Sequence, residues 1–315
     1  MKNNFKIHFL NTIWSDSIIL ESDNHYAFVD CASSFYYPMI QDYLKSLNVT
    51  KLDFILLTHF HSDHYGNVAK IINDYDVKTL YLKKYSAKEG DTGEGKKTTE
   101  EYFEHEMMMY NEIIDATNKN NVEMIFLDDI KYANVDNYII DFNNNILELY
   151  NLRNMIKEVY DDENSPYFQK YMFSENNNSI VIYANINSHK IFLGSDLTDS
   201  DTEAKVFYRL SERILKQIYE KHNIDYIDVY KSCHHGGGGT NKIELIELLN
   251  CKYAVITNTD HWLERWPTIE NLKNVRKDVK IYKTDHYQYV FDFSNKKIEI
   301  ESIPCESLFL TLNKS

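Results

Sequence analysis

The residues best suited to chemistry in this sequence lie in one short stretch, LLTHFHSDHYGN, at positions 56–67. Four of its side chains could bind a divalent ion: His59, His61, Asp63 and His64. Neutral imidazole and carboxylate are common ligands for zinc and similar metals. In an extended or loop segment, residues two apart can point to the same side, so His59 and His61 could share one ion. Asp63 and His64 follow at a turn, where Gly66 would relax the backbone, and could reach a second ion.

The alternative to a metal centre is a hydrophilic loop whose histidines have no common role. The spacing H-x-H-x-D-H should arise by chance on the order of once in a thousand chains of this size, which makes it far more specific than a lone glycine motif. Two ions about 3.5–4 Å apart are a common hydrolytic device, because together they hold the attacking and leaving oxygens. We therefore favour the metal centre.

Three apolar segments predict buried strands that end at candidate site residues. KLDFILL (51–57) ends directly at the histidine stretch. IFLGSDLTD is followed along the chain by VYKSCHHGGGGT, and they carry Asp196 and the pair His234 and His235. Adjacent side chains of a strand face opposite ways, so one histidine of the pair could bind metal while the other meets the substrate. The glycines after the pair would allow close approach of the backbone to a ligand.

The rest of the chain predicts an α/β protein with two sheets packed inside helices. Short β-branched and aromatic runs predict strands in both halves, and apolar residues at helical spacing predict the helices between them. Residues 84–120 interrupt this alternation with a polar loop and a long helix. We predict a single hydrolase domain over 1–315, with an insert at about 84–175 between its two halves.

The composition and net charge limit the kinds of substrate and partner that we expect. The formal net charge is −14 and no basic run is visible, so a small anionic substrate is favoured over nucleic acid. The four cysteines form no C-x-x-C pair, which suits reduced thiols in a cytoplasmic protein. Neither a signal peptide nor an apolar run of about 18 residues is visible, so no membrane association is expected. The sequence is silent on oligomeric state.

This set of motifs resembles the metallo-β-lactamase fold superfamily. More narrowly, it resembles the branch that contains the hydrolase domain of the competence protein ComEC and the phosphorylcholine esterases of choline-binding proteins. HFLNTIWSDSIILESDNHYAFVDCAS is similar to the opening pattern of that branch, and LLTHFHSDHYGN is its H-x-H-x-D-H signature. NNNSIVIYANINSHKIFLGSD, VYKSCHHGG and YAVITNTDHWLERWPTIENL are similar to its later elements. The resemblance covers most of the chain and implies a four-layer αββα sandwich.

The resemblance also implies roles for individual residues. His59 and His61 would hold the first ion, and Asp196 would bridge both ions. The second ion would be held by Asp63, His64 and His235. Asp63, Asp196 and His234 would be the catalytic set, with His234 contacting a phosphoryl or carbonyl oxygen and able to protonate the leaving group. Asp30 would orient a ligand histidine.

The implied activity is that of a dinuclear hydrolase whose bridging water attacks the phosphorus of a phosphodiester. Zinc is the expected metal, with manganese or iron open because nitrogen and oxygen ligands suit all three. Hydrolysis of a lactone or β-lactam at the same site is an alternative, and so is a metal-binding protein without catalysis.

The sequence departs from the family pattern at several positions. A third histidine for the first ion is missing; His105 is the only histidine between the signature and His189, and it lies on the long predicted helix. The family's opening glycines are replaced in IWSDS, and its closing H-P element reads Trp266-Pro267.

Several smaller features are less specific, and most of them allow two interpretations. Asn178 could cap a turn or line the site. His261, Trp262 and Trp266 could pack locally or form an aromatic wall. Cys233 is expected to be a small buried residue. The long helix could pack or cover the site.

Overall fold

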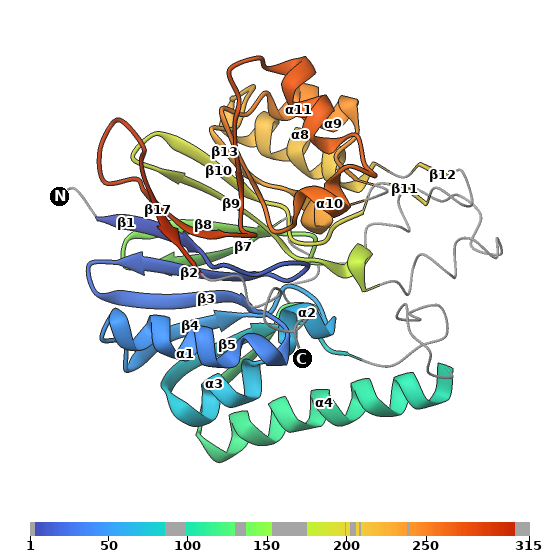
Figure 1. Ribbon diagram of the computed structural model, residues 1–315. Helices are drawn as coiled ribbons and strands as arrows, with labels where there is room; N and C mark the ends of the chain where they lie inside the picture. Colours follow the sequence, from blue (N-terminus) through green and yellow to red (C-terminus); the bar gives the residue numbers. More distant parts are fainter. Residues whose placement is uncertain are drawn as a thin grey trace.

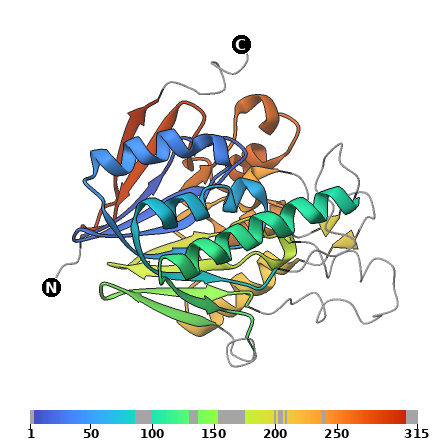
Figure 2. The same cartoon turned by 90° about the horizontal axis from the view of Figure 1, so that it is seen from below.

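The chain folds into two β-sheets that lie face to face, with helices on both outer sides (Figure 1). The computed structural model describes residues 4–85, 99–129, 137–152, 175–198, 200–201, 206–207, 209–237 and 240–305. The view from below shows the same layers, with the long helix α4 crossing the outer side of the first sheet (Figure 2).

The first sheet has eight strands, in the order β17-β16-β1-β2-β3-β4-β5-β6. β3, β4, β5 and β6 run parallel to one another, and the remaining pairs are antiparallel. The strands are β1 (Phe5–Phe9), β2 (Ser17–Ser22), β3 (His25–Cys31), β4 (Lys51–Leu56), β5 (Asp76–Leu82), β6 (Glu123–Phe126), β16 (Tyr287–Asp292) and β17 (Glu299–Pro304).

The second sheet has seven strands, in the order β15-β14-β13-β10-β9-β8-β7. β10, β13, β14 and β15 run parallel, so their carboxyl ends lie at one edge. The strands are β7 (Tyr138–Phe142), β8 (Asn145–Tyr150), β9 (Val181–Ile186), β10 (His189–Leu193), β13 (Val229–Lys231), β14 (Tyr253–Ile256) and β15 (Lys280–Lys283). A separate short pair consists of β11 (Ser200–Asp201) and β12 (Val206–Phe207).

Helices close both outer faces. The first sheet is covered by α1 (Tyr37–Ser46), α3 (Val68–Asp74) and α4 (Thr99–Lys119), and the second by α8 (Leu210–His222), α9 (Ile243–Leu249) and α11 (Thr268–Val275). Two short helices, α2 (Ser62–Tyr65) and α10 (Asp260–Leu263), lie near the edge where the strands end (Figure 1). Single turns of 3₁₀ helix are η1 (Ser34–Tyr36), η2 (Asn176–Asn178) and η3 (Cys233–Gly236).

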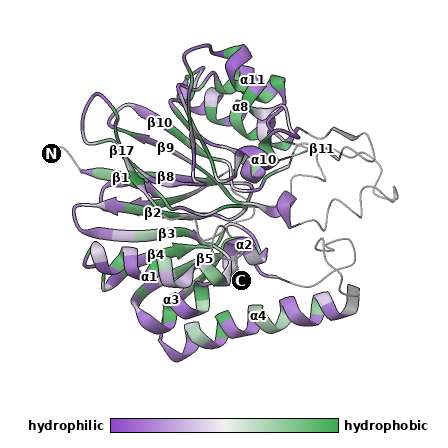
Figure 3. Cartoon of the chain, in the orientation of Figure 1, coloured by the Kyte–Doolittle hydropathy of each residue, from purple (hydrophilic) through white to green (hydrophobic). Residues whose placement is uncertain are grey.

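Three apolar clusters hold the layers together. One lies between the sheets and takes Leu56 from β4 and Leu193 from β10. A second fills the space between the second sheet and its helices, and a third does the same for the first sheet. The outer helices alternate hydrophilic and hydrophobic residues, as α4 does in Figure 3, because only one side of each helix is buried. The predicted four-layer α/β sandwich is confirmed.

The described part of the predicted insert completes both sheets. In residues 84–175, β6 pairs with β5 in the first sheet, while β7 and β8 pair with each other and β8 pairs with β9 in the second. β7 was not predicted from the sequence. The remainder of that segment lies outside the described residues. Among the helices that are described, none is long and apolar enough to cross a membrane.

Candidate metal centre

The site lies where strands of both sheets end at a common edge. The loop after β4 carries the histidine stretch, the loop after β10 carries Asp196, and the turn after β13 carries His235. Two hydrogen bonds join these loops across the sheets. Ser195 Oγ donates to Thr58 Oγ1 at 2.6 Å, and the Ile180 amide donates to the Thr58 carbonyl at 3.0 Å. Residues from three separate parts of the chain therefore meet at one place.

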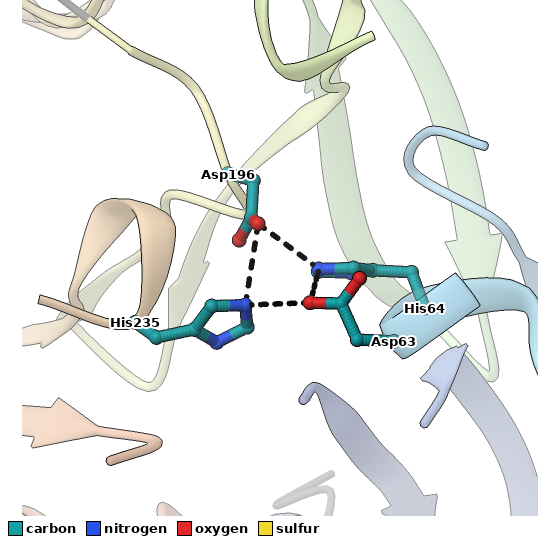
Figure 4. Close-up of side chains that lie close together, drawn as sticks. All are labelled: Asp63, His64, Asp196 and His235. Atoms are coloured by element: carbon teal, nitrogen blue, oxygen red, sulfur yellow. Dashed lines mark hydrogen bonds and ion pairs between the residues drawn. The ribbon is translucent and has the colours of Figure 1, made fainter. Parts of the chain in front are cut away.

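Four of the predicted ligands form a tight group (Figure 4). Their ligand atoms all lie within 4.8 Å of one another: Asp63, His64, Asp196 and His235. Asp196 Oδ2 lies 3.2 Å from Nε2 of His64 and 3.2 Å from Nε2 of His235. Asp63 Oδ2 completes the group, 3.1 Å from His235 Nε2 and 3.6 Å from His64 Nε2. This arrangement offers two imidazole nitrogens and two carboxylates to one cation.

The other two predicted ligands lie beside this group. His59 Nε2 is 3.2 Å from Nδ1 of His61 and 4.0 Å from Asp196 Oδ2. Asp196 Oδ2 thus lies near the imidazoles of His59, His64 and His235. His61 is partly exposed, whereas His59 and Asp196 are buried.

The three buried histidines each direct Nε2 toward Asp196, because Nδ1 is engaged elsewhere. His64 Nδ1 donates to Asp30 Oδ2 at 2.7 Å. Nδ1 of His59 lies 3.2 Å from Thr58 Oγ1, and Nδ1 of His235 lies 2.8 Å from Thr257 Oγ1. Both threonine hydroxyls donate their single proton to a carboxylate, so both can only accept from the histidine. The lone pairs on Nε2 are therefore left for a metal.

Two buried atoms of the group have no hydrogen-bond partner among the residues that the structure describes. His64 Nε2 and Asp196 Oδ1 are both inaccessible to solvent and unsatisfied. Leaving buried polar atoms unpaired costs about 1–3 kcal/mol each, so such atoms call for a particular explanation. A divalent cation coordinated here would satisfy them, and nitrogen and oxygen donors suit zinc, manganese or iron. The residues present fit the metal that the sequence predicts.

The charges at the site favour a cation. Burial disfavours a charged imidazolium, yet the carboxylate of Asp196 and those beside it outweigh burial and raise the pKa of His64 and His235 well above the usual value. Burial likewise opposes ionisation of Asp196, but His235 and His64 hold its pKa well below the usual range. By contrast, burial and the neighbouring His64 lower the pKa of His59. The carboxylates thus attract positive charge, as protons or as metal ions.

Asp30 lies where its predicted orienting role requires. It is buried near the end of β3, and both of its oxygens are occupied. The Thr58 amide and hydroxyl each donate to it at 2.8 Å, and His64 Nδ1 contacts it at 2.7 Å. Its own backbone has a φ of 58°, a conformation that is unusual for a residue other than glycine.

A second buried carboxylate behind the site was not predicted. Asp16, in the loop between β1 and β2, lies 3.3 Å from His235 Nδ1 and forms an ion pair with Lys231 of β13. The sequence held two signals for this pair. Asp16 belongs to the SDS triplet of the opening motif. Lys231 is a lysine at the end of a strand that is buried along its whole length.

The histidine pair lies in a turn instead of a strand. His234 and His235 belong to η3 and have φ values of 47° and 50°, in the left-handed region. Strand alternation, from which we argued that the two side chains would separate, therefore does not apply. The left-handed turn directs His235 into the metal group, while His234 Nε2 lies 3.5 Å from Asn176 Nδ2. Burial lowers the pKa of His234, which favours its neutral form.

Asn176, and not Asn178, is the asparagine next to His234. Asn178 donates to Glu175 Oε1 at 3.2 Å within the turn, and its carbonyl accepts from Lys83 at 2.6 Å. Asn178 therefore has the turn role that the sequence allowed for it. The amide of Asn176 is the group that sequence reasoning missed.

Gly66 is required for space and not for an unusual backbone angle. Its φ is −54°, which any residue adopts. A Cβ atom there would lie 2.6 Å from the Ala32 carbonyl oxygen and 2.6 Å from the Ser34 amide nitrogen. The close approach of the ligand loop to the loop after β3 therefore depends on this glycine.

Aromatic residues line one side of the site. The Trp14 ring lies 6.0 Å from that of His235 and 5.7 Å from that of Trp262, and Arg265 stacks over Trp262 at 4.3 Å. Trp266 instead lines a groove of about 560 Å³ between α10 and α11. Trp262 thus has the position predicted for an aromatic wall, with Trp14 as its unpredicted neighbour.

Two further predicted positions lie apart from the ligand atoms. His105 is on α4 and belongs to neither group of converging ligand atoms found among the described residues. Cys233 is buried, with its sulfur 3.7 Å from Ser211 Oγ. All four cysteines are described, and no disulfide joins them.

Comparison with known proteins gives one family match. Residues 15–132 match the model of the metallo-beta-lactamase superfamily. A search of curated proteins found no match. The segment that matches the family model covers β2 to β6, the ligand loop and α4.

Solved structures with similar folds include the metallo-beta-lactamase fold protein YhfI from Bacillus subtilis. It has a TM-score of 0.49 and 10% identity, and the alignment covers 96% of this chain and 100% of that one. Another is a diphosphatase from the PhnP family, with a TM-score of 0.43, 14% identity, and coverage of 92% of this chain and 98% of that one. Over residues 15–132 the chain is therefore similar to the metallo-beta-lactamase superfamily.

Proposed function

We propose that this chain is a dinuclear metal-dependent hydrolase that cleaves a phosphodiester bond. The observation that carries the proposal is the central position of Asp196 Oδ2, 3.2 Å from His64 and from His235 and 4.0 Å from His59. One carboxylate facing two sets of imidazole nitrogens suits two neighbouring ions better than one. The metal ligands would be His59, His61, Asp63, His64, Asp196 and His235.

Divalent ions bound there would activate a water and neutralise negative charge on the substrate. The chain's own residues would hold and orient the reactants. His59, His64 and His235 keep Nδ1 hydrogen-bonded within the protein, so their Nε2 atoms stay directed at the centre. This preorganisation favours the reaction because no ligand has to rearrange when substrate binds.

His234 would act on the substrate directly. Its buried Nδ1 has no hydrogen-bond partner in the described part of the chain, and its Nε2 lies beside the Asn176 amide. An imidazole and an amide next to the metal group would give hydrogen-bond donors to the oxygens of a tetrahedral phosphoryl group. His234 could also pass a proton to the leaving oxygen. A planar lactone would present fewer oxygens to these donors, so we prefer the phosphodiester.

Net charge and surroundings favour a small substrate. The formal charge of −14 would repel extended nucleic acid unless basic residues were gathered near the site. A small anionic diester needs only the local positive charge of the bound ions. Zinc is the metal we would test first, followed by manganese.

The test is hydrolysis of bis(p-nitrophenyl) phosphate by purified protein reconstituted with zinc or manganese, compared with a chelated sample. We expect metal-dependent turnover that is lost in His61→Ala. His25→Ala is the matched control, because His25 is exposed and its imidazole pairs with Asp53 on the surface. Two bound ions without turnover on any diester would contradict the proposal and favour a lactone substrate or a protein that binds metal without catalysis.

A further inference from the structure

We propose that Asp16 and Lys231 form a buried positioning unit that fixes the orientation of His235 for metal binding. The inference deepens the proposed function and rests on it. Asp16 and Lys231 are 1% and 0% exposed, respectively, and the Lys231 ammonium contacts Asp16 Oδ2. Burying two charges is unfavourable unless their geometry and remaining hydrogen bonds compensate, so stability alone is a weak reason for such a pair.

The unit reaches His235 through Thr257. The Thr257 hydroxyl donates its proton to Asp16 Oδ1 at 2.7 Å. That hydroxyl can then only accept from His235 Nδ1, which lies 2.8 Å away. His235 is thereby held with its proton on Nδ1 and its lone pair on Nε2, facing Asp63 and Asp196.

The same unit contacts the backbone beside two other ligands. The Asp16 amide donates to the Asp63 carbonyl at 3.2 Å, and Lys231 Nζ lies 3.4 Å from the carbonyl of Ser195, next to Asp196. Asp16 therefore links the β1–β2 loop to the ligand loop after β4. Lys231 links β13 to the loop after β10. A shift in either residue would move more than one ligand.

A buried cluster of two carboxylates and one histidine behind the metal group explains why a lysine is needed. Ligand atoms of Asp16, Asp30 and His64 lie within 4.8 Å of one another, and all three residues are buried. Two carboxylates so close together repel each other when both are ionised. Lys231 supplies the positive charge at this place, so we assign the group to an internal counter-charge and not to a third metal ion.

The unit predicts a specific effect on metal binding. Lys231→Met removes the counter-charge while keeping the length of the side chain, and Asp16→Asn removes the acceptor for Thr257. Outer-shell changes of this kind typically weaken metal affinity by about 10–100-fold. We expect both variants to weaken binding of the ion held by His235 by that factor, with the other ion less affected. Lys231→Arg should restore a large part of the affinity.

The experiment is isothermal titration of metal-free protein with zinc, together with thermal unfolding of the same metal-free samples. Lys221→Met is the matched control, because Lys221 pairs with Glu148 on the outer side of the second sheet. Unchanged zinc affinity in Lys231→Met and Asp16→Asn, with only a lowered unfolding temperature, would overturn the inference and leave a structural ion pair. Thr257→Val serves if those variants do not fold, since it removes only the hydroxyl; unchanged affinity there would also overturn it.

The outcomes separate this inference from the proposed function. A wild-type protein that binds no zinc would contradict the proposed function itself. A wild-type protein that binds two ions and hydrolyses the diester, beside variants of unchanged affinity, would contradict only the positioning unit.

Discussion

At the scale of single residues, Asp196 is the side chain on which the site depends. Its Oδ2 lies 3.2 Å from Nε2 of His64 and of His235, and its buried Oδ1 has no hydrogen-bond partner among the described residues. A buried carboxylate oxygen without a partner is unfavourable in a protein without metal. It is favourable in a protein whose carboxylate coordinates two ions.

The substitution Asp196→Asn should abolish most activity without unfolding the protein. The amide has nearly the same shape but lacks the negative charge that would join two ions. We expect the rate on bis(p-nitrophenyl) phosphate to fall by more than about 100-fold, since even outer-shell changes can cost about that much. Asp53→Asn, at a surface carboxylate, is the control for effects of purification and folding. Retention of full activity in Asp196→Asn would rule out a bridging role.

His234 should affect turnover more than metal binding. It lies beside the metal group, and no described residue forms a hydrogen bond with its Nδ1. We expect His234→Ala to lower kcat by about 100-fold or more, in the range typical for general acid–base groups, with zinc affinity within a few-fold of the wild type. Parallel measurements of kcat and of zinc binding check this. An equal loss of metal would instead make His234 a ligand.

Protonation and metal binding should compete at the same atoms. The pKa values of His64 and His235 are raised in the metal-free protein because the carboxylate of Asp196 and those beside it outweigh burial. Raised folded-state pKa values contribute stability that is present below the unfolded value of about 6.5 and is lost as the pH rises through the folded values. Asp196 has a lowered pKa, so its contribution is present above about 3.8 and is lost as the pH falls toward its folded value.

We expect the unfolding temperature of the chelated protein and the increase in that temperature on adding zinc to change in opposite directions with pH. Unfolding temperatures of chelated protein should decline as the pH rises above about 6.5, as these protons are lost. The increase in unfolding temperature on adding zinc should grow over the same range, because the metal no longer displaces protons. Thermal unfolding at a series of pH values, with chelator or with zinc, measures both. A zinc effect that is largest at low pH would contradict this account.

At the scale of elements, loops after parallel strands carry the site, and tight approaches between them set its geometry. The ligand loop after β4 packs on the loop after β3 through Gly66, and the turn η3 holds two histidines in left-handed conformations. The long helix α4 packs its Ile113 and Ala116 into the cluster beneath the first sheet. A covering role for this helix stays a prediction.

The substitution Gly66→Ala tests the loop contact. The added methyl group would meet the backbone of Ala32 and Ser34 at 2.6 Å, and backbone cannot move aside as a flexible side chain can. We expect the free energy of unfolding to fall by about 1–3 kcal/mol, as for other overpacked sites, and zinc affinity to fall with it. Urea unfolding measures the first quantity. Ser62→Ala, exposed on the same short helix, is the control, and equal stability of the two variants would show that the loops can separate freely.

At the scale of the whole molecule, metal binding should stabilise the fold because its ligands come from both sheets. A ligand that binds only the folded state at about 100 times its Kd adds about 2.7 kcal/mol. We therefore expect chelated protein to unfold at a lower temperature or urea concentration than zinc-loaded protein. Calorimetry with added chelator checks this. Identical unfolding curves would mean that the ligands do not hold a metal in the folded protein.

Most strands and helices could be predicted because their apolar residues follow the periods of buried elements. β7 was missed because YIIDF is short and follows an asparagine, so its pairing with β8 decides its conformation more than its own pattern does. The turn of His234 and His235 was missed for a similar reason. Its left-handed angles are stabilised by surrounding contacts, such as the bond from the His234 amide to the Ser195 carbonyl at 2.8 Å.

The sequence by itself determined the local part of the site. His59, His61, Asp63 and His64 lie within six residues, so covalent geometry brings them close together whatever the rest of the chain does. Only the tertiary structure decided which distant groups meet them. Asp16 and Lys231 are 215 positions apart. They come together because the pairing of strands and the packing of one sheet on the other bury both charges at the same edge, where each must find its partner.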